Sequence, residues 1–137
     1  MSPQEYLELI VEPTVAEFEL DQASVRRTFL ACAAVFHSID YIRPKRAKNL
    51  RKNFRNECAA FATIDRVAHA FKHVESDGKA PVRASAVYGR PPALAGAFVL
   101  GHSLLGDTTG AVFIDGENGD SLMVAVREVL DFLRQKL

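Results

Sequence analysis

A histidine and a carboxylate lie three residues apart in a long apolar segment, Val25 to Ile42, with the sequence VRRTFLACAAVFHSIDYI. At about 100° per residue this segment is apolar on two sides, which predicts a central, buried helix. His37 and Asp40 are among its few polar residues after Thr28. Because a buried polar group must be hydrogen-bonded, ion-paired or used in chemistry, we expect these two side chains to belong to a polar site.

A second polar cluster lies in the next long helical pattern, from Phe61 to Val74. Its polar face carries four titratable groups with a lysine beside them: Asp65, Arg66, His69 and His73, and Lys72. The opposite face carries an apolar stripe, formed by Ile64, Val67, Phe71 and Val74. Three interpretations are open: a solvent-exposed face with i,i+4 neighbours such as Asp65 and His69, a metal site, or a catalytic pair.

The metal interpretation combines both clusters. If the two helices face each other, nitrogen and oxygen atoms meet from five side chains: His37, Asp40, Asp65, His69 and His73. Metal sites in helical bundles are built from such ligands on facing helices. H-x-x-D and D-x-x-x-H-x-x-x-H also arise by chance, so this interpretation is an alternative. The primary expectation is a chain with no metal and no cofactor. Neither the phosphate-binding motif G-x-x-x-x-G-K nor the dinucleotide-binding motif G-x-G-x-x-G occurs.

The catalytic interpretation depends on Arg66 and His73, which are seven residues apart and therefore lie on one side of a helix. With this R-x6-H spacing, residues 1 to 77 resemble the HEPN superfamily, whose R-x(4-6)-H motif on a late bundle helix marks many metal-independent ribonucleases. The family typically has a polar residue after the arginine, where this chain has Val67. The longer string H-x-x-D-Y, C-x-x-F and A-H-A-F-K-H also resembles small uncharacterised bacterial proteins with the pattern H-x-x-D-W/Y, C-x-x-F, A-N-A-x-K-H.

The resemblance implies roles for both residues of the pair. It implies His73 as a base toward a ribose 2′-hydroxyl and Arg66 as the cation that stabilises the charge on the reacting phosphate. It also implies a homodimer that brings two such pairs together, in a bacterial protein that acts on RNA. The alternative from another class is a non-enzymatic structural or interaction protein, whose polar cluster is a buried hydrogen-bond network. That network consists of His37, Asp40, Arg66 and His73, with Asp65, His69 and Lys72 beside them.

The placement of glycine predicts how the chain positions these residues. All eight glycines lie between Gly78 and Gly119, so the backbone freedom needed for turns is confined to one segment. We therefore expect one domain of the α+β class, mainly a helical bundle of about four helices. The bundle should occupy residues 1–77, a small glycine-rich antiparallel β element residues 78–119, and a C-terminal helix residues 120–137.

Caps, prolines and periodicity predict the element boundaries. The first helix should begin with the capping box at Ser2 and stop before Pro13, and Asp21 should cap the central helix, which ends at Arg43-Pro44. Further helices are predicted for residues 47–58 and 60–76, and strands for 82–88, 97–100 and 111–114. The last helix should bury a single stripe, formed by Leu122, Val126, Val129, Leu130 and Leu133.

Charge is unevenly distributed although the formal net charge is zero. Every charged residue from Glu5 to Asp21 is acidic, and every charged residue from Arg43 to Arg55 is basic. The basic run is able to follow a phosphate backbone. We favour a solvated helix face that lies against the acidic N-terminal helices. Cys32 and Cys58 fit a core, and the lack of a long apolar run predicts no membrane association and a cytoplasmic location.

Overall fold

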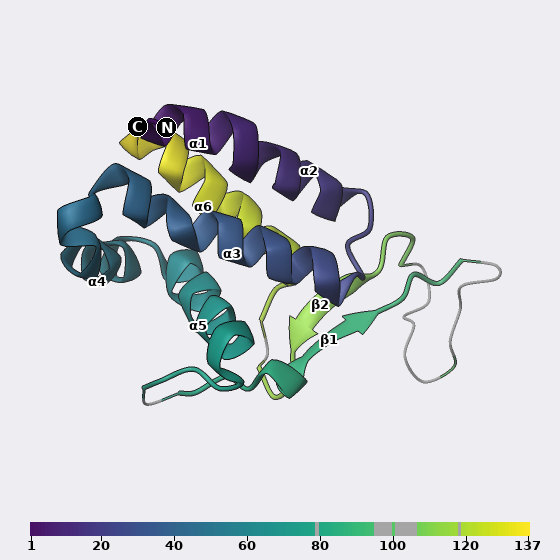
Figure 1. Cartoon of the computed structure of the whole chain (residues 1–137). Helices are drawn as coiled ribbons and strands as arrows, with labels where there is room; N and C mark the ends of the chain where they lie inside the picture. Colours follow the sequence, from purple (N-terminus) through teal and green to yellow (C-terminus); the bar gives the residue numbers. More distant parts are fainter. Residues whose placement is uncertain (79, 95–99, 101–106, 118) are drawn as a thin grey trace.

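The computed structural model describes residues 1–78, 80–94, 100, 107–117 and 119–137. The predicted α+β class is confirmed, because helices form most of the described chain, two strands form a small antiparallel sheet, and the last element is a helix. Helix α3 (Val25–Ile42) lies across the middle of the molecule (Figure 1) and contacts α1, α2, α4, α5 and α6. The central position predicted for this segment is therefore confirmed.

The N-terminal helix continues through Pro13, so the predicted stop before this proline is wrong. Helix α1 (Pro3–Tyr6), the π-helix η1 (Leu7–Val11) and α2 (Glu12–Glu19) follow one another without a break, and Figure 1 shows them as one rod. Pro13 has no N–H to donate to the preceding turn, and the turn before it is widened into the π-helix. The Thr14 hydroxyl donates to the Ile10 carbonyl at 2.6 Å, which satisfies an acceptor in that turn.

Helix α3 begins after Ser24, whose hydroxyl accepts the N–H of Arg27 at 3.3 Å. The predicted cap, Asp21, is wrong by three residues, because the chain makes a further turn in which Ser24 N–H donates to the Asp21 carbonyl. Two hydroxyls buried on α3 are satisfied by carbonyls of the preceding turn: Thr28 donates to Ser24, and Ser38 to Ala34. These residues, and not His37 or Asp40, are the buried polar groups of this helix.

Two further helices complete the N-terminal bundle. The short helix η2 (Pro44–Arg46) leads into α4 (Ala47–Glu57), and Cys58 separates α4 from α5 (Ala59–His73). Helix α5 ends three residues before the predicted limit, because Val74 has a φ of 70°, which is outside the right-handed helical region. Helix α5 packs against α3, α4 and α6.

The sheet is shorter than predicted and begins later. After the 3₁₀-helix η3 (Ala84–Ala86), β1 (Val87–Arg90) pairs with β2 (Ala111–Ile114), with Val87 opposite Ile114. The strand prediction for 82–88 is wrong except for its last two residues. Strand β1 also includes Gly89, where a Cβ atom would collide with the Ala23 carbonyl, so a side chain is excluded there. The strand predicted at 97–100 lies outside the described residues except for its last one.

Helix α6 (Leu122–Lys136) confirms the predicted final helix, and the five residues of its predicted stripe are buried. It contacts α2, α3, α5 and β2. Arg127 pairs with Glu19 and Arg134 with Glu12, both at 2.8 Å. The acidic N-terminal helices therefore face α6, and the predicted contact with the basic run is wrong. No helix within the described residues has the length and apolar character needed to cross a bilayer.

Candidate functional site

His37 and Asp40 form an ion pair on the surface. His37 Nδ1 lies 2.9 Å from Asp40 Oδ2, and each side chain is 51% exposed. A carboxylate only accepts, so Nδ1 carries the hydrogen and Nε2 faces away from the pair. The expectation that these two residues are buried is wrong, because this side of α3 is left open between the N-terminal helices and α5.

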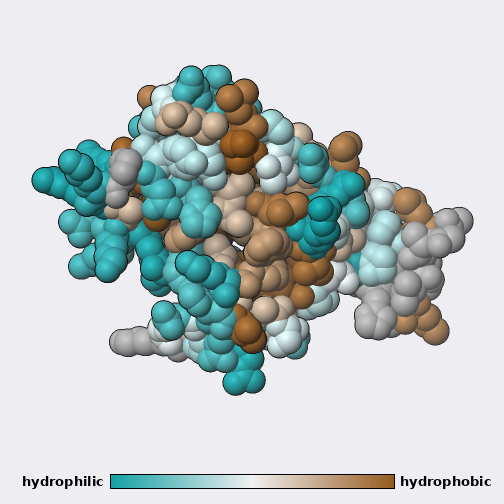
Figure 2. Space-filling view, viewed as in Figure 1, coloured by the Kyte–Doolittle hydropathy of each residue, from teal (hydrophilic) through white to brown (hydrophobic). Residues whose placement is uncertain are grey.

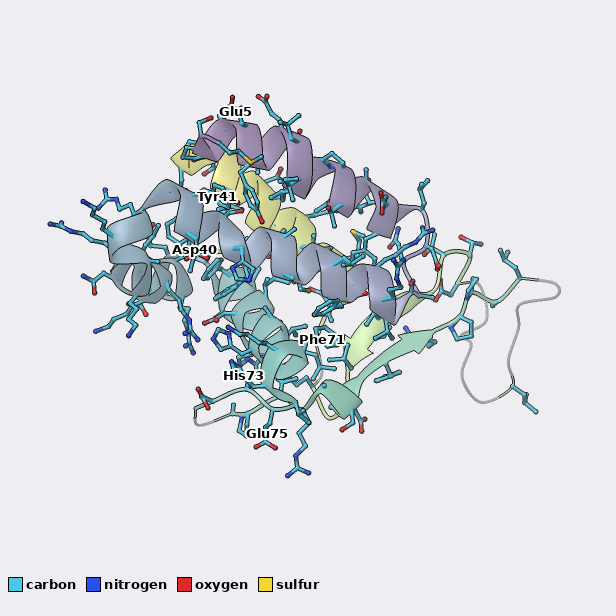
Figure 3. All side chains as sticks on the ribbon, viewed as in Figure 1. Glu5, Asp40, Tyr41, Phe71, His73 and Glu75 are labelled. Atoms are coloured by element: carbon cyan, nitrogen blue, oxygen red, sulfur yellow. The ribbon has the colours of Figure 1, made fainter. Side chains whose placement is uncertain are left out.

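The pair lines a groove between α3 and the N-terminal rod. We call it the N-terminal groove; its volume is about 780 Å³. It is lined by Met1, Tyr6, Ile10, Thr14 and Glu17 from one side and by Leu30, Ala33, Ala34, His37, Asp40 and Tyr41 from α3. The rings of Tyr6 and Tyr41 stack at 3.9 Å within it. Figure 3 shows Tyr41 in the space between α3 and the N-terminal rod, with Asp40 beside it along α3.

Among the described residues, Asp65 is the one buried carboxylate, and it joins α5 to α4. Its side chain is 1% exposed, and Oδ2 accepts from Arg51 Nε at 2.9 Å. Arg55 Nη1 lies 3.4 Å from the same oxygen. Two arginines one helical turn apart on α4 thus neutralise one buried carboxylate, which is the arrangement that makes such burial tolerable. We call Asp65, Arg51, Arg55 and His69 the Asp65 cluster.

His69 completes this cluster on the α5 side. Its Nδ1 lies 2.9 Å from the Asp65 carbonyl oxygen and 3.1 Å from Asp65 Oδ1. The predicted i,i+4 neighbours Asp65 and His69 are therefore confirmed, but α4 covers Asp65 in place of solvent and His69 packs on α3. The His69 ring packs edge-on to Phe36, and His73 lies one turn further along, with ring centroids 6.2 Å apart.

Arg66 is held by the loop that precedes α6. Its guanidinium donates to both oxygens of Glu117, at 2.7 and 3.0 Å, and to the Ala80 carbonyl at 3.3 Å. A bidentate pair of this kind occupies the fork that would otherwise bind a phosphate. Glu117 carries no signal in the sequence that predicts this role, because it lies 51 residues from Arg66 in an ordinary turn.

The structure does not assemble the predicted sites into one centre. His37 and Asp40 line the N-terminal groove, Asp65 and His69 face α4, and Arg66 faces Glu117. Lys72 and His73 are exposed in the last turn of α5, and Figure 3 shows His73 at the far end of α5 from α4. Among the described residues, no group of three or more His, Cys, Asp and Glu side chains is arranged to hold a metal ion.

The basic run forms an exposed surface at one end of the molecule. Five of its cations are exposed and have no ion pair within the described residues: Arg43, Lys45, Arg46, Lys48 and Lys52. We call these five the basic face. A groove of about 560 Å³ borders it, lined by Lys48, Arg51, Lys52, Arg55, Asn56 and Asp77. Figure 2 shows hydrophilic residues gathered over α4, on the left of the view.

Burial shifts the pKa of two side chains near the centre of the molecule. The pKa of Tyr6 rises to about 12, mainly because burial disfavours the phenolate, and the charges of Tyr41 and Asp40 add to this. Its hydroxyl donates to the Ala34 carbonyl at 3.0 Å. Burial also raises the pKa of the Cys32 thiol to about 12. The predicted core position of both cysteines is confirmed, since each is buried and reduced.

No family model, curated protein or solved structure matches this chain.

Proposed function

We propose that this chain binds RNA through the basic face and the groove beside it. The observation that carries the proposal is that the face presents five exposed cations without ion pairs in the described part of the chain. Lysine and arginine that are free to release counterions from phosphates supply most of the affinity of a nucleic-acid surface. The resemblance to the HEPN superfamily supports RNA as the nucleic acid.

The groove provides a place for the phosphates. Lys48 and Lys52 lie one turn apart on α4, and Arg51 and Arg55 line the same groove. The two arginines share one counter-charge, Asp65, so together they add one uncompensated positive charge to the groove. Asp77 is the single carboxylate of the lining. The net positive charge of this groove favours a polyanion, and the lysines are the residues that contact it first.

The proposal does not include cleavage by Arg66 and His73. Arg66 is engaged by Glu117, and a phosphate would have to displace a bidentate partner. The Asp65 cluster supports a second role for the polar residues of α5, namely that of a structural network. It holds α4 against α5 and thereby fixes the direction of the basic face.

The experiment compares the salt dependence of RNA binding between two matched double variants. Fluorescence anisotropy of a labelled single-stranded RNA and of an RNA duplex measures Kd for the wild type, for Lys48→Gln with Lys52→Gln, and for a control. The control, Arg26→Gln with Arg127→Gln, removes the same charge from α3 and α6, away from the basic face. We expect the lysine variant to bind about tenfold more weakly and to reduce the slope of log K against log salt by about 1 for each lysine.

Three results would overturn the proposal. One is that the wild type binds neither RNA at low salt. Another is that the control variant loses as much affinity as the lysine variant. The third is that vesicles containing phosphatidylserine bind tightly while RNA does not, which would assign the basic face to an anionic membrane surface.

A further inference from the structure

Three aromatic side chains follow one another along α3, next to the groove on α4. They are Phe29, Phe36 and His37, and we call them the aromatic row. Arg51 connects the row to the groove that it lines, because its guanidinium carbon lies 5.8 Å from the centroid of the Phe36 ring. Figure 2 shows apolar residues at the centre of the viewed face, beside the hydrophilic residues over α4. The aromatic row is therefore continuous with the cationic groove.

Neighbouring rings hold the aromatic row in place. Phe36 packs edge-on to His69, and Phe29 packs edge-on to Phe71, both pairs with ring centroids 5.1 Å apart. Phe36 and His37 also meet edge-on, at 5.3 Å. These contacts restrict the rotation of the rings before any ligand arrives, so a ligand that stacks on them loses less affinity to the ordering of side chains.

Two rings of the row are open to solvent. Phe29 is 39% exposed, and the side chain of His37 is 51% exposed. The two residues are eight positions apart, which places them about 12 Å apart along the helix axis at about 1.5 Å per residue. Successive stacked bases are about 3.4 Å apart, so the row has the length of about three bases.

The charges beside the row favour one orientation of a nucleotide strand. Lys48, Arg51 and Lys52 line the groove on the α4 side and attract phosphates. Asp40 pairs with His37 on the side of the N-terminal groove, and its carboxylate repels phosphates. The phosphates are therefore directed to α4 and the bases to the rings of α3. A duplex does not fit this arrangement, because its bases are paired and stacked on one another.

We propose that the aromatic row binds the bases of single-stranded RNA while the groove on α4 binds its phosphates. This inference rests on the function proposed above and adds the class of RNA to it. Phenylalanine and histidine rings are among the side chains on which unpaired bases stack. Every base has a π-face, so stacking tolerates any sequence. The expected ligand is a strand without base pairs and without a required sequence.

The test separates the bases from the phosphates. Fluorescence anisotropy measures Kd for a labelled single strand of about 12 nucleotides, for an abasic strand of the same length and for an RNA duplex. The abasic strand keeps the phosphates of the single strand but has no base to stack. The buffer is at about pH 8, where histidine with its usual pKa is neutral. We expect the strand with bases to bind about tenfold more tightly than the abasic strand.

Matched variants separate stacking from charge and shape. Phe29→Leu and His37→Gln remove a ring but keep apolar volume or a polar group, and each should lower the affinity for the strand with bases about fivefold. Phe29→Tyr and His37→Phe keep a ring and should retain that affinity. All four variants should bind the abasic strand as the wild type does, and thermal unfolding checks that each is folded.

Failure of this inference and failure of the proposed function give different results. A wild type that binds neither strand would remove the RNA surface altogether, whereas equal affinity for the two strands would remove the stacking alone. Wild-type affinity for the strand with bases in both Phe29→Leu and His37→Gln would also overturn the inference. A wild-type dimer that these two variants convert to a monomer in sedimentation would assign the aromatic row to a second copy of the chain.

Discussion

Two histidine–aspartate pairs on neighbouring helices have opposite environments. His37 and Asp40 on α3 are each 51% exposed and pair with each other, whereas Asp65 on α5 is 1% exposed and lies among Arg51, Arg55 and His69. The residue types are the same and the spacing differs by one position. The environment of such a pair therefore depends on what the neighbouring elements place opposite it: two arginines on α4 for one pair and an open groove for the other.

The largest expected effect is the loss of the buried carboxylate. Asp65→Asn keeps the shape of the side chain but leaves Arg51 and Arg55 without a counter-charge, and we expect it to lower the free energy of unfolding by about 3 kcal/mol. Urea denaturation followed by circular dichroism measures the change. A loss below about 0.5 kcal/mol, which is the range of surface pairs, would show that the packing of α4 against α5 does not depend on Asp65.

An alkaline titration tests the environment of Tyr6, which lies in the N-terminal groove beside the exposed pair. The pKa of Tyr6 is raised to about 12 from an unfolded value of 10, so the neutral phenol stabilises the fold fully below pH 10. That stability, about 2 to 3 kcal/mol, is lost as the pH rises from 10 to 12. Tyr6→Phe should remove this part of the alkaline destabilisation.

Comparison of Tyr6→Phe with the wild type also controls for the titration of Cys32. Tyr6→Phe retains Cys32, whose thiol also loses stabilisation above its unfolded pKa, so the difference between the two proteins reports Tyr6 alone. Asp40→Asn should lower the pKa of Tyr6, because the Asp40 charge disfavours the phenolate. An unchanged Tyr6 titration in Asp40→Asn would contradict the electrostatic contact between the exposed pair and the groove.

The Arg66–Glu117 pair is expected to give an intermediate effect. The two side chains are 20% and 36% exposed, and their bidentate contact ties α5 to the loop before α6. Arg66→Gln should destabilise the fold by about 1 kcal/mol. Glu117→Gln should cost a similar amount, and the double variant little more than either, as measured in a double-mutant cycle. Strictly additive losses would mean that the two side chains do not interact.

The smallest effect is expected at the exposed pair. His37→Ala should change the free energy of unfolding by less than about 0.5 kcal/mol. Both side chains are half exposed, so the Asp40 carboxylate stays hydrated when its partner is removed. Thermal unfolding of this variant beside Asp65→Asn tests the comparison directly. A His37→Ala loss of about 2 kcal/mol or more would mean that the pair is buried in solution.

Sequence patterns predicted the helices well because their signals are local. The end of α3 before Pro44, the stripe of α6 and the i,i+4 contact of Asp65 with His69 follow from periodicity and from prolines. The start of α3 and the passage of the first helix through Pro13 were missed, because tertiary packing allows a π-helix and a later cap. The spacing of Arg51 and Arg55 does indicate a shared carboxylate, since two bases one turn apart on a helix are suited to bind one acidic side chain.

The assembly of the site was not predictable in the same way. Helical spacing gives the face of α5 that carries Asp65, Arg66 and His73, but not the element that covers each part of that face. Helix α4 covers Asp65, and the loop with Glu117 captures Arg66. Both contacts join segments that are distant in the sequence, so no local pattern contains them.

We propose that the free lysines of α4 act on RNA while the polar residues of α5 hold the fold. One RNA-binding and cleavage assay on three proteins tests it: the wild type, Lys48→Gln with Lys52→Gln, and Arg66→Gln with His73→Ala. We expect only the lysine variant to lose affinity, by about tenfold. A wild type that cleaves RNA, with cleavage lost in the Arg66 and His73 variant while affinity and folding stay intact, would contradict it.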